Sequence, residues 1–324
     1  MEIDGLDRQI VHALRIDGRA GYREIGALLG VSDQTVARRY RRLREGAGVR
    51  VVGLPNPIRL GYESWMLRLH SRPDMAATLA EALARRGDTG WVSLFSGGTE
   101  ISCLVQVPAH ADRETLLLQK LPRTPGLISV SAHCLIHHYV GGAVGPDRRD
   151  DYLTPEQTAA LSADVPAPGS PAPPERLADG DAALMEALAR DGRAGFAELA
   201  AATGWPESTV RRRMRDLRRS GILYYDVEVR PQTFGFRAPV LLWVTVAPAR
   251  LATVGAALAG HDEVVFAAAT TGATNLVATV VCRDMAAFYR YLTERISGLD
   301  GVDRVESAPL LRHVKQLGAV ATQR

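Results

Sequence analysis

The residues with the clearest chemical potential in this 324-residue chain are arginines gathered in two short segments. Segment 32–45 contains five Arg, and segment 206–219 contains six. Arg is frequent everywhere, with 37 Arg against 2 Lys, yet these segments carry formal charges of +3 and +4 while the rest of the chain sums to −4. Guanidinium groups concentrated in this way are typical of a surface that binds a polyanion. The alternative is an ordinary solvated helix face.

The spacing of apolar residues predicts that the first segment is a helix. Val36, Tyr40 and Leu43 recur at intervals of four and three, and Ser32 precedes them as a good N-cap. The outward positions then carry polar and basic side chains, which is typical of a helix that enters a DNA groove. We predict that the residues contacting DNA are Ser32, Gln34, Thr35, Arg38, Arg39, Arg42, Ser208, Thr209, Arg211, Arg212, Arg213 and Arg215.

Length and composition limit the class of protein. A chain of this length suggests two or more cores, and its hydrophobic content of 46% is ordinary for a globular protein. The three cysteines lack metal-type pairing, which favours a reduced, cytoplasmic compartment. No export signal is evident, and the most apolar region, 238–259, is interrupted by prolines and an arginine, so no membrane contact is expected.

The chain is an internal repeat. The sequence DGRAG at 17–21 recurs identically at 191–195, an offset of 174. Matches at this offset continue through both Arg-rich segments, and after one inserted residue an offset of 175 pairs His138 with His313. Two copies of one two-part unit therefore make up the chain.

The first part of each unit is predicted to be three short helices. The patterns fall at 7–16, 22–29 and 32–45 in the first copy, and at 181–190, 196–203 and 206–219 in the second. Tight turns before the third helix make each triplet a helix-turn-helix. Pro206 stands where Ser32 caps the first copy, so the second basic helix is expected to survive with an altered start.

The second part of each unit alternates strand and helix patterns in the order βαββαβ. The predicted elements are 63–70, 75–86, 91–96, 99–107, 112–121 and 128–139, then 238–246, 249–260, 264–271, 274–282, 285–296 and 302–313. This order indicates a ferredoxin-like antiparallel sheet with both helices on one face, so something must cover the other face. The fold class is thus α+β, with two tandem copies of a winged-type helix-turn-helix plus a βαββαβ domain.

These patterns give five predicted regions. They are helix-turn-helix domain 1 at 1–53, βαββαβ domain 1 at 60–140, a linker at 141–178, helix-turn-helix domain 2 at 179–229 and βαββαβ domain 2 at 236–318. Within the linker, Thr154 should cap a short helix that reaches about residue 163. The Pro-rich stretch 165–175 then acts as a tether of roughly 34 Å if fully extended.

A helix-turn-helix joined by a short strand to a βαββαβ domain resembles the Lrp/AsnC (leucine-responsive, feast/famine) family of transcription regulators. The motifs are Leu6-Asp7, the DGR turn, and 29–32 leading to Arg39 and Leu43, and the similarity covers nearly the whole chain twice. The second copy departs from the pattern, with Gly180-Asp181 in place of Leu-Asp. The resemblance implies a regulator rather than an enzyme, with DNA binding by the helical parts and with dimerisation and amino-acid-type effector sensing by the sheet domains.

The resemblance also implies an effector site at the loop between the two central strands of each sheet domain, where the family has a Gly followed two residues later by an acid. The matching residues are Ser96, Gly97, Gly98, Thr99 and Glu100, and in the second copy Thr271, Gly272, Ala273, Thr274 and Asn275. A loop rich in backbone N–H groups with a carboxylate could bind both ends of a zwitterion, whereas the alternative is a plain polar β-turn. Asn275 lacks the acid, so the second site is expected to be altered or lost.

The sequence gives weaker support for other kinds of site and function. His133 and His137 share a strand face but lie about 13 Å apart at roughly 3.3 Å per residue, so they cannot bind one ion, and neither a metal nor another cofactor is predicted. The main rival is a siroheme decarboxylase, an enzyme built on a similar unit and sometimes fused as two copies, but the Tyr-rich final strand expected there is not matched. A third alternative is a sensor whose helix-turn-helix units only dimerise, which the two Arg-rich helices argue against.

The fusion predicts an intrachain pseudo-dimer. The exposed sheet faces of the two βαββαβ domains could pack together, while one chain supplies both recognition helices to double-stranded DNA. The helices differ, since Gln34 stands opposite Ser208 and Ala37 opposite Arg211, so the operator should be asymmetric. Further assembly into homo-oligomers is allowed but is not required for one such contact.

Overall fold

The computed structural model describes residues 3–108, 125–144, 152–163, 177–316 and 319–320. The predicted helix at 112–121 and the Pro-rich tether at 165–175 fall outside this part of the chain. The chain forms two compact units, and each is described here by itself. The helical unit is Met1–Leu60 with Gly142–Gly235, and the sheet unit is Gly61–Gly141 with Phe236–Arg324. Each unit thus combines corresponding parts of both sequence copies.

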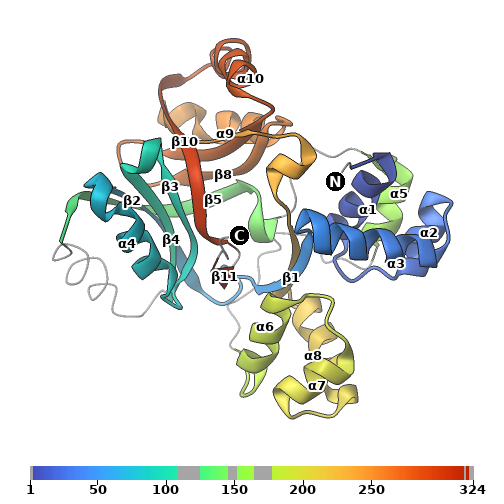
Figure 1. The fold of residues 1–324 in the computed structure, drawn as a ribbon. Coiled ribbons are helices and arrows are strands. Elements are labelled where there is room, and N and C mark those ends of the chain that lie inside the picture. Colours follow the sequence, from blue (N-terminus) through green and yellow to red (C-terminus); the bar gives the residue numbers. More distant parts are fainter. Residues whose placement is uncertain (1–2, 109–124, 145–151, 164–176, 317–318, 321–324) are drawn as a thin grey trace. The chain divides into compact units, whose positions relative to one another are not determined.

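The helical unit contains both predicted triplets (Figure 1). Its elements are α1 (Gly5–Ile16), α2 (Tyr22–Leu29), α3 (Asp33–Arg42), a π-turn (Leu43–Ala47), β1 (Arg50–Pro55), α5 (Pro155–Ser162), α6 (Asp181–Arg190), α7 (Phe196–Thr203), α8 (Glu207–Arg219) and β6 (Leu223–Glu228). The basic helices α3 and α8 begin at equivalent residues, Asp33 and Glu207. The proline that replaces the Ser32 cap therefore leaves the start of α8 unshifted.

Local sequence explains the helix boundaries. Ser32 accepts a hydrogen bond from the backbone N–H of Thr35, as the sequence predicted for an N-cap. The turns that precede α3 and α8 pass through Gly30 and Gly204, whose φ values of 69° and 71° are left-handed and favour glycine. The predicted linker helix is α5, which Thr154 caps through a capping box.

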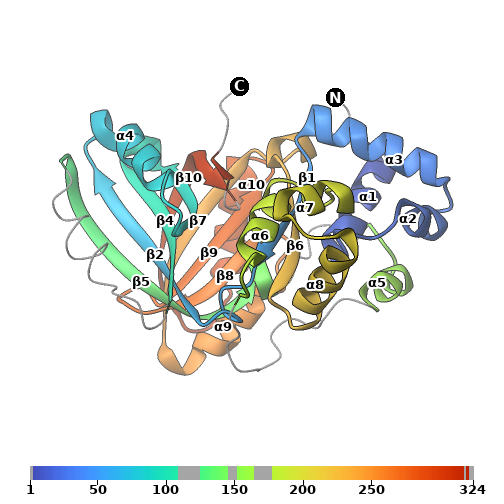
Figure 2. The same cartoon turned by 90° about the horizontal axis from the view of Figure 1, so that it is seen from below.

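The two helical triplets are joined by a two-stranded antiparallel ribbon of β1 and β6 (Figure 2). Its register pairs Arg50 with Glu228 at one end and Pro55 with Leu223 at the other. Two Arg50–Glu228 side-chain hydrogen bonds, of 2.9 and 2.6 Å, support the first end. The ribbon makes the two helix-turn-helix parts one body, a pairing that the sequence did not reveal.

The sheet unit contains two ferredoxin-like folds, which confirms the predicted fold class, and in the first of them the segment between its last two strands lies outside the described residues. The elements of the first are β2 (Tyr62–Ser71), α4 (Pro73–Ala84), β3 (Thr89–Phe95), β4 (Glu100–Pro108) and β5 (Leu127–Val140). Those of the second are β7 (Ala238–Val246), α9 (Leu251–Ala259), β8 (Val264–Thr270), β9 (Leu276–Cys282), α10 (Met285–Arg290), a π-turn (Tyr291–Ile296) and β10 (Val302–Gln316). Both have the strand order 4-1-3-2 of a ferredoxin-like sheet.

The long final strands close the two sheets into one ring. β5 pairs with β2 through its first half and with β8 through its second half, while β10 pairs with β7 and then with β3. The ring order is β10-β7-β9-β8-β5-β2-β4-β3 and back to β10. Because every strand of the ring has two neighbours, none is left as an open edge.

Within the described residues of the sheet unit, apolar side chains form three cores. One lies under α4 and one under α9 and α10, as expected where helices cover an outer sheet face. The third joins residues of both copies, among them Met66 and Phe95 from the first and Leu241, Trp243 and Val277 from the second. The inner faces of the two sheets therefore cover each other. In the described part of the chain, no helix has the length and apolar character needed to span a membrane.

Candidate nucleic-acid interface

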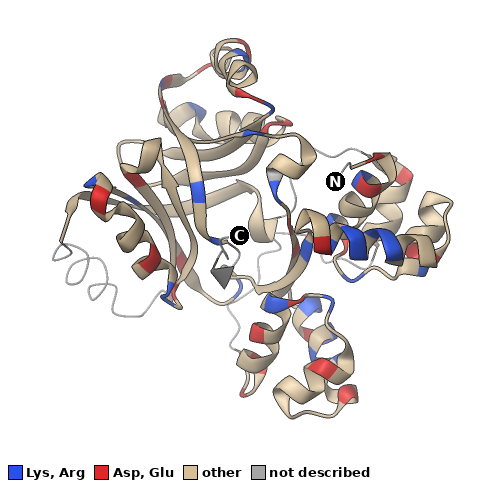
Figure 3. Cartoon of the chain, in the orientation of Figure 1, with Lys and Arg blue, Asp and Glu red and all other residues tan. Residues whose placement is uncertain are grey.

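Helix α3 is rich in basic residues (Figure 3), and the residues that it exposes are polar or basic. Val36 and Tyr40 are buried against the helical core, and at 100° per residue the opposite face carries Gln34, Arg38 and Arg41. All three side chains are exposed, and neither arginine has an ion-pair partner among the residues that the structure describes. These groups can therefore reach a groove or a phosphate.

The corresponding face of α8 is more basic. Val210, Met214 and Leu217 form its buried stripe. The opposite face carries Ser208, Arg212, Arg215 and Arg219, which are exposed and, for the described residues, form no ion pair. At the offset of 174, Arg219 stands where α3 is followed by Glu45, so the two faces differ in charge as well as in shape.

Arg39 and Arg42, which we predicted to contact DNA, pair with carboxylates at the start of α1. Arg39 forms ion pairs with Asp4 and with Asp7, the latter at 3.2 Å, and Arg42 pairs with Asp7. Asp7 has no exposed surface, so its charge requires these partners. The hydrogen bond from Arg39 also lowers the pKa of the Asp4 carboxyl. The expectation that Arg39 points outward is wrong, because it counters a buried carboxylate.

Arg213 has the same role in the second copy. Its Nε and Nη2 donate to the two oxygens of Asp181 at 2.8 and 2.6 Å. Asp181 is fully buried and also accepts a hydrogen bond from the backbone N–H of Ala178 at 2.7 Å. Arg213 therefore belongs to the fold of its helical triplet, and the prediction that it lies on the outer face is corrected in the same way.

Four further predicted contacts lie at the edge of the exposed face. Arg211 pairs with Glu207 at 3.4 Å, and its guanidinium lies 3.8 Å from the centre of the Phe196 ring. The hydroxyl groups of Ser32 and Thr35 form a hydrogen bond of 2.9 Å with each other, so part of their hydrogen-bonding capacity is already used at the start of α3. Thr209 is only partly exposed. These side chains flank the exposed polar and basic row of each helix.

The two helical triplets contact each other through reciprocal pairs. Arg19 donates to the carbonyl oxygens of Gly192 and Ala194 at 2.9 and 3.0 Å. Arg193, its equivalent, donates to those of Gly18 and Ala20 at 2.7 and 3.0 Å. When residue i contacts j and the equivalent of j contacts the equivalent of i, the interface has two-fold character. The interface within this one chain is therefore arranged like that of a symmetric dimer.

A second reciprocal set involves the ends of the basic helices. Arg44 pairs with Asp191 at 2.9 Å, and Arg218 pairs with Asp17 at 2.8 Å. Each arginine lies at the C-terminal end of a basic helix, and each aspartate lies in the DGR turn of the other triplet. The C-terminal end of each basic helix is thus tied to the DGR turn of the other triplet.

The glycines of the two DGR turns are required by this packing. A Cβ at Gly18 would lie 2.7 Å from the Tyr225 Cβ, and one at Gly192 would lie 2.8 Å from the backbone carbon of Val52. The backbone N–H of Gly192 also donates to the carbonyl of Val51 at 2.8 Å. Both turns press on the ribbon so closely that no side chain fits. This explains why a glycine recurs at the centre of both DGR turns.

The predicted effector loops have different surroundings in the two copies of the sheet domain. In the first, Gly97 and Thr99 are exposed, while Glu100 is 3% exposed and pairs with Arg68 at 3.0 Å. Arg68 also bonds Glu306 at 2.7 Å, which lowers the pKa of that carboxyl. The Glu100 carboxylate therefore already has a cationic partner.

In the second copy, the Asn275 side chain is hydrogen-bonded to the neighbouring strand β7. Its side-chain oxygen accepts from the backbone N–H of Val246 at 2.8 Å, and its amide donates to the carbonyl of the same residue at 2.7 Å. Thr271, Gly272 and Ala273 are exposed, and Thr274 is buried. Asn275 thus fixes the loop to β7 instead of presenting a charge.

Comparison with known proteins gives the family. The AsnC-type helix-turn-helix domain matches at residues 3–44 and again at 177–218, and the Lrp/AsnC ligand binding domain matches at 239–320. An uncharacterized HTH-type transcriptional regulator of Pyrococcus furiosus is 31% identical over 135 residues, which is 41% of this chain and 91% of the relative. The chain belongs to the Lrp/AsnC family. The HTH-type transcriptional regulator LrpA of Pyrococcus horikoshii is 27% identical over 136 residues, covering 42% of this chain and 96% of that protein.

Among solved structures, the siroheme decarboxylase NirDL is similar over the full duplicated architecture. It matches with a TM-score of 0.62 at 12% identity, covering 97% of this chain and 93% of NirDL. A likeness at this identity shows a shared fold. The two chains thus share one fold over nearly their full lengths.

Sequence reasoning missed the contacts that join the helical triplets. Arg19, Arg193, Arg44 and Arg218 were not among the predicted functional residues, although the first two belong to the identical DGRAG repeats. An exact five-residue repeat within copies that otherwise diverge was the available signal. His133, considered as a metal ligand, instead bonds the Thr271 carbonyl at 2.8 Å through its ring Nδ1.

Proposed function

We propose that this Lrp/AsnC-family chain is a transcriptional regulator that binds DNA as an intrachain pseudo-dimer, with α3 on one half-site and α8 on the other. The observation that carries the proposal is the reciprocal pairing of the two helical triplets through Arg19 and Arg193. Helix-turn-helix dimers read two half-sites about 34 Å apart because two-fold symmetry presents two recognition helices. Here one chain supplies both.

The chemistry of the exposed rows supports an asymmetric operator. Gln34 can form two hydrogen bonds with the adenine edge, whereas the shorter Ser208 cannot. Arg38 and Arg212 are exposed at equivalent positions and are available for guanine or phosphate. Glu45 and Arg219 differ in sign, so the duplex is held more tightly at the α8 half-site.

Fluorescence anisotropy with duplexes selected from random DNA tests the binding function. The logarithm of the association constant should fall linearly with the logarithm of salt concentration, with a slope of about −0.9 for each phosphate neutralised. Arg38→Ala and Arg212→Ala should each reduce that slope by about one. The absence of salt-dependent binding to any selected duplex would refute the proposal.

We further propose that a small effector of the amino-acid class binds at the Gly97–Thr99 turn, with backbone N–H groups receiving its carboxylate. Glu100 is paired with Arg68, so an effector's ammonium group would have to share the carboxylate with that arginine. The second loop, with Asn275 bound to Val246, is proposed to be inactive. A thermal-shift screen of amino acids and their derivatives tests this, because a ligand of the folded state raises apparent stability with concentration. Loss of the shift in Gly97→Val, but not in Gly272→Val, is expected.

A second candidate function is favoured by one observation, the match to the siroheme decarboxylase NirDL over 97% of the chain. An enzyme of that class would bind a tetrapyrrole. Titration with siroheme separates the candidates, because binding would shift the absorption spectrum of the pigment. An unchanged spectrum together with sequence-specific DNA binding supports the regulator.

A further inference from the structure

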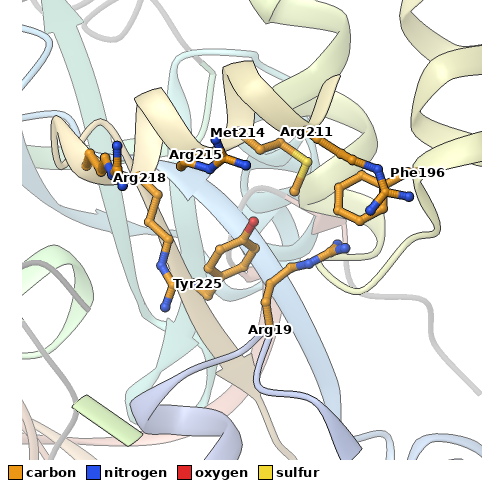
Figure 4. A pocket seen from close by; sticks show the side chains of 8 residues that line it. Arg19, Phe196, Arg211, Met214, Arg215, Arg218 and Tyr225 are labelled. Carbon is orange, nitrogen blue, oxygen red and sulfur yellow. The ribbon is translucent and has the colours of Figure 1, made fainter. Parts of the chain in front are cut away.

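A basic cavity lies beside the recognition helix α8 within the helical unit (Figure 4). Its volume is about 390 Å³, which is within the range of small-ligand pockets. Five arginines surround it: Arg19 from the turn after α1, and Arg211, Arg215, Arg218 and Arg219 from α8. Phe196, Met214 and Tyr225 supply the apolar part of the lining.

Two arginines of this pocket, Arg218 and Arg19, are fixed in place by the fold. Arg218 is held by Asp17 and lies 5.8 Å from the centre of the Tyr225 ring, and Arg19 is held by two carbonyl oxygens. Burial lowers the pKa of Arg19 and raises that of Tyr225 to about 12, consistent with a site partly removed from water. Preorganised donors of this kind bind an anion at low entropic cost.

The pocket has an excess of positive charge. Arg218 and Arg211 are paired with Asp17 and Glu207. Arg19, Arg215 and Arg219 have no carboxylate partner in the described part of the chain, so roughly three charges remain uncompensated. Guanidinium groups bind oxyanions through charge-assisted, often bidentate hydrogen bonds. The matching ligand is therefore an oxyanion with two or three negative charges.

The first copy of the sequence shows that the fold does not require this pocket. Tyr40 occupies the position of Met214, is 4% exposed, and lies 5.6 Å from the Arg193 guanidinium across its ring. Its ring centre is 6.1 Å from that of Tyr22, the equivalent of Phe196. A phenol ring thus fills the corresponding space.

The charges differ between the copies in the same direction. At the offset of 174, Arg211 corresponds to Ala37 and Arg219 to Glu45. Both changes add positive charge to the second copy alone. Of the two equivalent places, the one in the first copy is filled by Tyr40 and is less basic, whereas the one in the second copy is open and strongly basic.

We propose that this cavity is a binding site for a small polyvalent oxyanion, either a phosphate compound or a polycarboxylate, and that its occupancy controls DNA binding by α8. Arg215 and Arg219 line the cavity and also belong to the exposed row of α8 that is proposed to contact DNA. A ligand that neutralises them removes cationic contacts from one half-site and leaves α3 unchanged. This second step rests on the proposed DNA-binding function, and the coupling must be reciprocal.

Isothermal titration calorimetry of the full chain with pyrophosphate, and separately with citrate, tests the site without DNA. One site per chain is expected. Met214→Tyr should weaken binding by at least about tenfold, since it installs the side chain that closes the equivalent space in the first copy. Arg219→Glu installs the residue found at the equivalent position of the first copy, and it should also weaken binding because it replaces a positive charge with a negative one. Arg212→Ala removes an exposed charge outside the cavity and should change affinity by less than about twofold.

Three outcomes would overturn the proposal. Equal effects of Arg212→Ala and Arg219→Glu, with none from Met214→Tyr, would mean diffuse attraction to a basic surface. A ligand-free loss of DNA affinity in Met214→Tyr equal to its loss of pyrophosphate affinity would assign the cavity to a DNA backbone phosphate. Failure of both pyrophosphate and citrate to bind the wild-type chain would refute the proposed anion site. This result is independent of whether the chain binds DNA. Circular dichroism of Met214→Tyr confirms that the variant is folded.

Discussion

Arg213→Ala is predicted to destabilise the second helical triplet, although a basic residue on a recognition helix would ordinarily be assigned to DNA. The substitution removes both side-chain donors to Asp181, whose carboxylate is fully buried. One backbone donor, from Ala178, would remain. An ionised carboxylate with a single hydrogen bond in this position must either recruit water or take up a proton, and both cost free energy.

The magnitude follows from the burial of the pair. Removing one partner of a buried ion pair costs about 3–5 kcal/mol. The Arg213 side chain is 29% exposed, so water can partly replace it, and we expect about 2–4 kcal/mol. Arg212→Ala is the matched control, because Arg212 is the adjacent, exposed arginine and should change the free energy of unfolding by less than about 0.5 kcal/mol.

Hydrogen exchange followed by mass spectrometry is the appropriate assay, because global unfolding of a chain with two units does not report on one triplet. Peptides from α6 and α8 should exchange about 30- to 700-fold faster in Arg213→Ala, because each 1.4 kcal/mol of the predicted loss of stability corresponds to a tenfold change. Peptides from α4, in the sheet unit, serve as the internal reference. Unchanged exchange in α6 together with lost DNA affinity would refute the structural role and restore Arg213 as a DNA contact.

Two further predictions concern backbone packing and pH. Gly192→Ala should destabilise the helical unit by about 1–3 kcal/mol, because the added Cβ meets the Val52 backbone, whereas Gly195→Ala, with nothing within 4 Å of the added Cβ, should be nearly neutral in thermal unfolding. Burial lowers the pKa of His313 to about 4, so between pH 6.5 and 4 the unfolded chain binds more protons than the folded one. The free energy of unfolding should therefore fall by about 1–3 kcal/mol on acidification over this range, allowing for partial exposure, and a urea-unfolding series in which His313→Gln keeps the full wild-type dependence would contradict the assignment.

Periodicity and repeats predicted most of the fold. The helical triplets and the βαββαβ order could be predicted because the spacing of apolar residues in helices and strands is a local signal. The closure of the sheets into a ring depends on β5 and β10 each pairing with two partners, and pairing between distant strands leaves no mark on either strand alone. For the same reason, the pairing of β1 with β6 could not be predicted from the sequence.

The recognition helices show where sequence reasoning about sites fails. The composition of α3 and α8 could not distinguish Arg38, which is exposed, from Arg39, which holds a buried carboxylate. The distinction depends on Asp7, 32 residues away, and the Leu6-Asp7 motif was used only as a mark of family. A buried acid near the start of the first helix, together with an arginine that follows it at the same spacing in both copies, was the signal that could have separated structure from function.

The central claim is that one chain reads two different half-sites with two different helices. Quantitative footprinting of a selected operator, with every base pair substituted in turn, tests this most directly when repeated for Arg38→Ala and Arg212→Ala. We predict an asymmetric site in which Arg38→Ala relaxes base preference in one half and Arg212→Ala relaxes it in the other. A palindrome with equal penalties at mirror-related positions, affected in both halves by each variant, would show that equivalent helices of two chains read the DNA and would contradict the account.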